Sequence, residues 1–231
     1  MISFAFLWKR AKSFTDPAYI NHIVSSIAEH TTHACDFVCV TDQVKHPTTW
    51  EAGGHEVRAF PLKKNFSRHQ HCKLEIFRPD LELCERAVLT DLDNFVLDDL
   101  DELLEYDGIF GARRTFLPET RPQPQLSWAQ FHTPSCFPIW EHAKALSDKE
   151  VYEFAPTGQG RGDQLFVYKV VGEYDRLDDL YPGALESWKF GWDERAKILF
   201  AHGKPKPHQL EWTPYWPFDQ LSEDVKKKRQ Q

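Results

Sequence analysis

The sequence lacks several features that would place it in a specialised class of protein. No run approaches the roughly 18 consecutive apolar residues of a membrane-spanning helix, so we expect no transmembrane segment. The five cysteines are odd in number, form no Cys-x-x-Cys pair and show no spacing typical of a zinc site. We therefore expect free thiols in a protein of a reducing compartment. The composition also excludes collagen-like, coiled-coil and disulfide-scaffold proteins.

Basic residues are too few for a protein that binds nucleic acid. The chain has 28 Lys and Arg against 35 Asp and Glu, a net charge of -7. An acidic surface gains nothing from the counterion release that drives binding to a nucleic-acid backbone, so we expect no nucleic-acid partner. A local basic pocket for a small phosphate ligand stays open, because net charge does not determine the local field.

Aromatic residues, in contrast, are abundant enough to fill a sizeable core. The 231 residues include 17 Phe, 8 Trp and 7 Tyr within an apolar fraction of 41%. We expect one domain at residues 1–221 and a flexible basic tail at residues 222–231, with peripheral contact of the tail to an anionic membrane as an alternative. The N-terminal apolar run has its basic residues after it, the reverse of a secretory signal. We therefore expect a buried first strand and a cytoplasmic protein.

Short apolar runs alternate with helical patterns in the first half of the chain. We expect strands at Ile2–Trp8, Asp36–Thr41, Glu56–Phe60, Ala87–Thr90, Gly108–Ala112 and Ala196–Ala201. We expect helices at Asp16–Glu29, His71–Phe77, Leu100–Leu104 and Pro138–Leu146, loops at Asp42–Gly54 and Thr115–Leu126, a flexible segment at Thr157–Gly162, and a helix or strand at Asp163–Val171. This alternation predicts an α/β fold with a mostly parallel sheet flanked by helices. Ligands of such sheets bind at the carboxyl ends of the strands.

Two aspartates follow one of the expected strands, in the segment AVLTDLDNFVL at Ala87–Leu97. If the chain stays extended there, the period of two places Asp91 and Asp93 on the same side. Carboxylates this close repel each other unless a cation lies between them, and a divalent cation with oxygen ligands is the natural occupant. The alternative is a solvated acidic turn, because further aspartates follow directly.

A histidine and two lysines follow the last expected strand, in LFAHGKPKP. His202 ends the strand, Gly203 permits close approach of the backbone, and prolines stiffen the loop that carries Lys204 and Lys206. Such a loop suits one metal ion and one phosphate, although an isolated histidine at a strand end is more often structural.

Taken together, these segments resemble a known family. TDLDNFVLDDLDELL resembles the Asp-x-Asp motif of nucleotide-sugar-dependent glycosyltransferases of the GT-A fold, and FAHGKPKP resembles their C-terminal His-Gly-Lys-Pro element. RGDQL, CVTDQ, HCKLEIFRP and ESWKF are similar to further elements of the glycogenin-like and lipopolysaccharide-galactosyltransferase-like group. The motifs occur in the family's order from about residue 2 to residue 208.

The resemblance implies a Rossmann-like GT-A fold and a role for each matching residue. Asp91, Asp93 and His202 would bind Mn²⁺, with Mg²⁺ as the alternative. The donor nucleotide and diphosphate would contact Asp42, Lys73, Asp91, Leu92, Gly203 and Lys206. The residues facing the transferred sugar or the acceptor would be Asp163 and Gln164, which are also the candidate catalytic residues, with Ser187 and Lys189. The donor would be a UDP-linked sugar, transferred with retention to a saccharide, lipid or protein acceptor.

The chain departs from the family pattern in ways that leave donor sugar and acceptor open. Asn94 replaces a small hydroxyl residue, and LSWAQF replaces the Asn-Ser-Gly sequence that lines the sugar pocket in many relatives. Two alternatives remain. One is a haloacid-dehalogenase-like phosphatase, for which Lys169 and Asp178–Asp179 would supply the later motifs. The other is a non-catalytic module that binds a nucleotide or a protein, with Trp212, Tyr215 and Trp216 as its surface.

Overall fold

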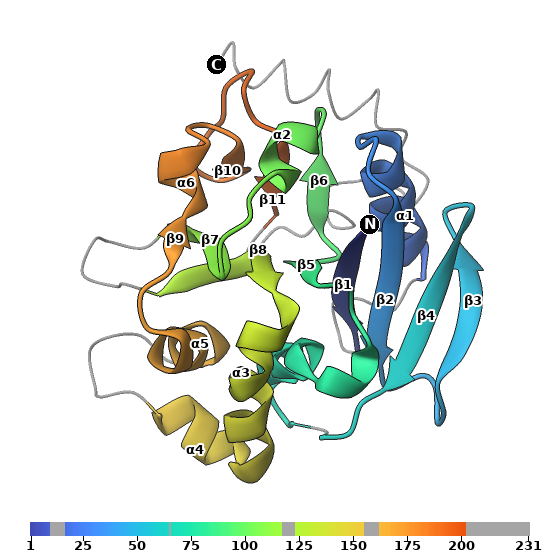
Figure 1. The fold of residues 1–231 in the computed structure, drawn as a ribbon, viewed down its shortest axis with the longest axis vertical. Helices are drawn as coiled ribbons and strands as arrows, with labels where there is room; N and C mark the ends of the chain where they lie inside the picture. The colour runs from blue at the N-terminus through green and yellow to red at the C-terminus, as the bar shows by residue number, and fades with distance from the viewer. Residues whose placement is uncertain (10–16, 65, 117–122, 155–161, 202–231) are drawn as a thin grey trace.

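The computed structural model describes residues 1–9, 17–64, 66–116, 123–154 and 162–201, arranged around an eight-stranded sheet (Figure 1). In spatial order its strands are β3 (Thr48–Ala52), β4 (His55–Pro61), β2 (Cys35–Thr41), β1 (Ile2–Trp8), β5 (Arg86–Thr90), β8 (Pro124–His132), β7 (Phe110–Arg114) and β9 (Asp175–Arg176). The pairs β4–β2, β2–β1, β1–β5 and β7–β9 are parallel, and the other three pairs are antiparallel. A second, three-stranded sheet has the order β10 (Leu185–Ser187), β11 (Ile198–Phe200) and β6 (Asn94–Val96).

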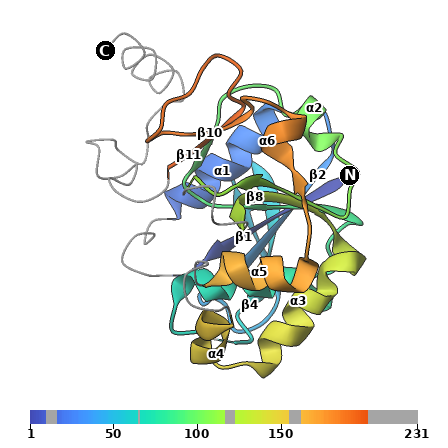
Figure 2. The same ribbon diagram turned by 90° about the vertical axis from the view of Figure 1, so that its left-hand side faces the viewer.

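Helices cover both faces of the large sheet, as Figure 2 shows. One side carries α1 (Ala18–Glu29), α2 (Asp101–Leu104) and α6 (Leu177–Leu180). The other side carries α3 (Thr133–Ala145), α4 (Asp148–Glu153), α5 (Asp163–Val171) and the 3₁₀ helices η1 (His69–Phe77) and η2 (Pro79–Leu81). None of these described helices is both long and apolar enough to cross a membrane. The α/β architecture expected from the sequence is confirmed.

The central strands read as continuous apolar runs because both of their faces are buried. In β1, Phe4 and Phe6 pack under α1, whereas Ala5 and Leu7 pack under η1 and α3, and all four are buried. This alternation follows from the period of two of a strand. Two apolar cores therefore form, one on each side of the sheet.

Two segments expected to be loops contain strands. Residues Thr48–Ala52 form β3, which pairs with β4 across the two-residue turn Gly53–Gly54, where φ is +56° and +79°. Glycine takes these angles without strain, and a Gly-Gly pair is typical of a tight hairpin. The other segment is Thr115–Leu126, in which β8 begins at Pro124 and Leu126 is fully buried.

Further expectations need correction. Asn94–Val96 forms a separate strand, β6, which pairs with β11 in the second sheet. The last expected strand therefore belongs to the second sheet rather than the central one. The segment at His71–Phe77 is a 3₁₀ helix that begins at His69, and α3 begins at Thr133, upstream of Pro138. The Thr157–Arg161 part of the glycine-rich segment, the domain end at residue 221 and the basic tail lie outside the described residues.

Candidate active site

A lysine–aspartate ion pair lies where β5 ends. Asp91 follows the last residue of β5, and its backbone N–H donates to the Ser127 carbonyl on β8 at 3.0 Å. Lys73 Nζ, from η1, lies 2.5 Å from Asp91 Oδ1, and Ser127 Oγ donates to Asp91 Oδ2 at 2.8 Å. The Lys73 side chain is 12% exposed and that of Asp91 22%, so water screens the pair only weakly. A cation and an anion are thus held together at the carboxyl edge of the sheet.

Three carboxylates determine the charge of Lys73. Burial by itself lowers the pKa of the Lys73 amine, but Asp91, Asp163 and Asp93 act in the opposite direction and outweigh it. The pKa of Lys73 is therefore raised above its ordinary value, and the amine is protonated at neutral pH. Three carboxylates therefore act on one lysine, and their charges favour a cation nearby.

The chain turns directly after Asp91, so the two aspartates of the motif do not share one face of an extended strand. The Asn94 N–H donates to the Asp91 carbonyl at 3.4 Å, which closes a turn over the intervening residues. Asn94 Nδ2 donates to Thr90 Oγ1 at 3.1 Å and to the Ser127 carbonyl at 2.5 Å. The chain is therefore not extended at Asp91–Asp93, so the condition under which the period of two would place both side chains on the same side is not met. Asn94, which departs from the family pattern, ties the turn to both β5 and β8.

Leu92 and Asp93 form the middle of this turn. Leu92 is 4% exposed and packs in the apolar core shared with α1, so a nucleotide contact from this residue would come from its backbone. Asp93 is 6% exposed, and its charge acts on Lys73. Asp93 therefore stays within electrostatic reach of the ion pair in spite of the turn.

Asp42 follows β2 at the same edge of the sheet. Because β1 lies between β2 and β5 and runs parallel to both, the residues that follow β2 and β5 converge. His69 at the start of η1 lies within electrostatic reach of Asp42, Asp91 and Lys73. Burial lowers the pKa of His69 and the Lys73 charge lowers it further, so this imidazole is neutral at pH 7. Sequence reasoning missed His69, which the structure adds to the cluster.

The helix α5, which lies on the same side of the sheet as η1, brings Asp163 and Gln164 to the cluster. Gly162 precedes the helix with a φ of +98°, and Asp163 is its first residue, 8% exposed. Burial raises the pKa of Asp163, whereas the charges of Lys73 and His71 oppose that rise. A carboxylate in the first turn of a helix is also favoured by the helix dipole. Asp163 therefore lies within electrostatic reach of Lys73, and its place at the transferred sugar stays a prediction.

A chain of side-chain hydrogen bonds connects Gln164 to Asp91. Gln123 Nε2 donates to Gln164 Oε1 at 3.3 Å, and Gln164 Nε2 donates to Gln125 Oε1 at 2.5 Å. Gln125 Nε2 donates to Ser127 Oγ at 3.2 Å, and Ser127 Oγ donates to Asp91 Oδ2. Every donor in the chain therefore points toward the Asp91 carboxylate. Gln123 and Gln125 were missed because their segment was read as a loop, and Ser127 follows that segment directly. Polar residues at every second position are nevertheless typical of one face of a strand.

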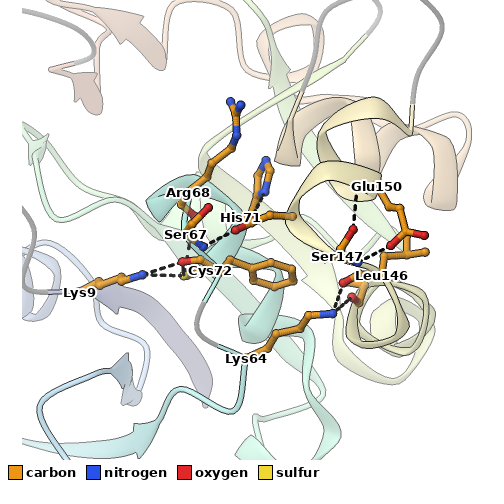
Figure 3. A network of polar contacts seen from close by, with 12 residues as sticks. Lys9, Lys64, Ser67, Arg68, His71, Cys72, Leu146, Ser147 and Glu150 are labelled. Atoms are coloured by element: carbon orange, nitrogen blue, oxygen red, sulfur yellow. Dashed lines mark hydrogen bonds and ion pairs between the residues drawn. The ribbon is translucent and has the colours of Figure 1, made fainter.

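Polar contacts hold η1, and with it Lys73, in place (Figure 3). Lys9, which follows β1, donates to the Phe66 carbonyl at 2.7 Å. His71, which is 1% exposed, has its Nδ1 2.8 Å from Asp148 Oδ1 at the start of α4. Because no side chain caps the start of η1, contacts of this kind fix its position.

The second sheet carries Ser187 and Lys189. Ser187 is fully buried, and its Oγ accepts a hydrogen bond from the Lys189 N–H at 3.1 Å, whereas the Lys189 side chain is exposed. In the described part of the chain neither side chain hydrogen-bonds to Asp91 or Lys73. Their place near a donor therefore stays a prediction.

The same sheet returns the chain to the aspartate turn. β11 runs antiparallel to β6 with Phe200 opposite Asn94, so the chain reaches this turn two residues before His202. His202, Gly203 and Lys206 themselves lie outside the described residues. The metal and phosphate contacts expected from them stay predictions.

Two of the three later residues that a phosphatase would need form ion pairs with an arginine of β7. Asp178 and Asp179 both pair with Arg114 of β7, at 2.7 and 3.1 Å. Lys169 is exposed in the last turn of α5. Because Arg114 engages both aspartates, these contacts give no support to a phosphatase site around Asp91. The aromatic residues suggested for a binding module, Trp212, Tyr215 and Trp216, lie outside the described residues.

Solved structures of glycosyltransferases are similar to this chain. With GlyE of Streptococcus pneumoniae TIGR4 the TM-score is 0.68 at 16% sequence identity, over 99% of this chain and 65% of GlyE. With the bifunctional glycosyltransferase WbbM it is 0.62 at 15% identity, over 97% of this chain and 49% of WbbM. With the galactosyltransferase LgtC, in complex with donor and acceptor sugar analogues, it is 0.51 at 13% identity, over 97% and 95%.

The similarity is one of structure rather than of sequence. No protein-family model matches the chain, and no curated protein is significantly similar to it. The chain spans about two thirds of GlyE and about half of WbbM, but nearly all of LgtC. Together with the central sheet and its two helical layers, these matches show that the chain has the fold of GT-A glycosyltransferases.

Proposed function

We propose that the chain is a glycosyltransferase that moves a sugar from a UDP-linked donor to a saccharide acceptor, with retention of configuration. The observation that supports this most directly is the buried ion pair of Lys73 and Asp91, with Asp93 and Asp163 beside it, at the carboxyl edge of a GT-A fold. The LgtC structure contains donor and acceptor sugar analogues, which is the basis for proposing the same two substrate classes here.

A divalent cation suits the charges of this site. Asp91, Asp93 and Asp163 act together on one lysine, so their negative charge is only partly compensated. The described residues contain no group of three or more His, Cys, Asp and Glu side chains able to hold a metal ion, and we propose His202 as the third ligand. Carboxylate and imidazole ligands together suit Mn²⁺, with Mg²⁺ as the alternative. Once bound, the cation would act as a Lewis acid toward the leaving diphosphate.

The chain's own residues supply the remaining stabilisation. Lys73 would place a preorganised positive charge where the diphosphate gains negative charge as the sugar–phosphate bond of the donor breaks. Asp163 and Gln164 present oxygen atoms to the sugar, which gains positive charge in the same step. Asp42 accepts a hydrogen bond from the base. Contacts of Leu92, Ser187, Lys189, Gly203 and Lys206 with the donor complete the proposal.

The test is release of nucleoside diphosphate from a panel of nucleotide sugars in the presence of Mn²⁺. We expect release that depends on the metal and falls by about 10²–10³-fold in Asp93→Ala, because the cation that would stabilise the developing charge loses one of its ligands. The control is Asp98→Ala, an exposed residue of the same acidic stretch, which is expected to keep wild-type activity. Release of inorganic phosphate from phosphomonoesters would instead support the phosphatase. Nucleotide binding without turnover of any donor would support the binding module.

A further inference from the structure

Two glutamines hold the Gln164 amide, one at each end. Gln125 lies in β8, and Gln123 is the residue before this strand. Its carbonyl oxygen accepts from Gln123 Nε2 at 3.3 Å, and its NH₂ group donates to Gln125 Oε1 at 2.5 Å. We propose that Gln123 and Gln125 are positioning residues that fix the orientation of the Gln164 amide, and thereby which sugar hydroxyl the site accepts. This inference rests on the proposed function, in which Gln164 faces the transferred sugar.

The charge of Asp91 determines the direction of these bonds. Rotating the Gln164 amide by half a turn would place two oxygens together at Gln125 and two NH₂ groups together at Gln123. Reversing Gln125 as well would require Ser127 Oγ to donate to Gln125, and its 2.8 Å bond to the Asp91 carboxylate would be lost. Hydrogen bonds to a charged group are the stronger ones, and bonds in a chain reinforce each other. One orientation of Gln164 is therefore favoured.

Burial makes this preference effective. Gln123, Gln125 and Ser127 are 4%, 7% and 6% exposed, so water cannot replace a bond that one of them loses. Gln123 Oε1 is buried and has no hydrogen-bond partner among the described residues. A network that served stability alone would be expected to satisfy this acceptor. Gln123 instead adopts the orientation in which its Nε2 donates to the Gln164 carbonyl.

A fixed amide has a fixed recognition pattern. With one side of its carbonyl and one N–H already used, Gln164 can offer one acceptor position and one donor position to a ligand. A site whose buried polar groups are matched to one pattern of hydroxyls discriminates strongly against the wrong pattern. Gln164 then distinguishes sugars that differ in the direction of a hydroxyl.

The directions of the two bonds give a test with opposite outcomes for the same substitution. Gln125→Glu keeps the oxygen that accepts from Gln164, so the preference between two epimeric UDP-hexoses is retained even if the overall rate falls. Gln123→Glu removes the N–H that donates to Gln164 and puts an acceptor there. The preference is then expected to fall by roughly 10-fold or more. The pair of hexoses is the one that the wild-type protein separates most.

The preference between the two UDP-hexoses is measured in two ways, and Met variants at both positions are added in case a Glu variant fails to fold. The ratio of kcat/KM values for nucleoside diphosphate release and the ratio of Kd values from calorimetry with Mn²⁺ are compared, with UDP alone as the reference. Gln123→Met and Gln125→Met are both expected to reduce the preference. Gln130→Met replaces another buried glutamine of β8, which donates to the Leu103 carbonyl at 2.8 Å, and is expected to leave the preference unchanged.

Each outcome decides between the two proposals. If all four variants at Gln123 and Gln125 keep the wild-type preference between the two UDP-hexoses and still bind UDP, the positioning role is overturned and the proposed function is left standing. Loss of preference to the same extent in Gln125→Glu and Gln123→Glu would also overturn it, because a merely structural role predicts no difference between them. A wild-type protein that binds neither UDP nor any UDP-hexose would overturn the proposed function and this inference with it.

Discussion

The stability of the Lys73–Asp91 pair gives the most direct test of the site as described. Lys73→Met removes the charge but keeps most of the apolar stem, and besides the ion pair it removes a 3.5 Å bond from Lys73 Nζ to the Leu126 carbonyl. The Asp91 carboxylate then stays 22% exposed without its cation, although Ser127 still donates to it. Breaking a buried ion pair in this way is unfavourable because the remaining charge is desolvated and uncompensated.

The expected magnitude follows from the burial of the two groups. Loss of one partner of a fully buried pair costs about 3–5 kcal/mol. Partial exposure of Asp91 and its remaining bond to Ser127 lower this to about 2–3 kcal/mol. The double variant Lys73→Met/Asp91→Asn has no charge to compensate at either position. It is expected to be more stable than Lys73→Met, because the part of the cost that comes from Asp91 is recovered while Asp93 and Asp163 stay without the lysine.

Urea denaturation at pH 7 measures these free energies of unfolding for the wild-type protein, the two single variants and the double variant. A cost below about 0.5 kcal/mol for Lys73→Met would show that the pair behaves like an exposed surface pair. Additive costs in the double variant would show that the two residues do not interact. Either result would refute the reasoning about this site.

Three other changes test the surroundings of the site, each by the free energy of unfolding. Leu126→Ala is expected to cost about 2–5 kcal/mol, because Leu126 is fully buried in β8, whereas a surface loop would tolerate it. Asn94→Ala is expected to cost about 1–3 kcal/mol through the bonds lost from the turn. Burial raises the pKa of Asp80, but hydrogen bonds from Arg78 and Lys63 outweigh it and lower the pKa to about 2. The stability from Asp80 is therefore present above its ordinary pKa and lost as pH falls toward 2, and Asp80→Asn is expected to flatten that acid-side decline.

Much of the central sheet could be predicted from local sequence. β1, β2 and β5 are short apolar runs because they are buried on both faces, and this burial leaves a direct trace in composition. β8 leaves a weaker trace, since Gln123, Gln125 and Ser127 alternate along its start, close to three prolines. These polar side chains are buried because partners far away in the sequence satisfy them, and no local pattern shows such partners.

The sequence by itself determined where polar chemistry follows a buried strand, at Asp42 and Asp91, because strand ends are marked by local composition. Only the tertiary structure decided that Lys73 pairs with Asp91, and that Gln164 is connected to the same carboxylate through β8. The order of the strands and the packing of η1 and α5 bring these groups together. A bond between side chains distant in the chain has no local signature, since it depends on how whole elements are placed.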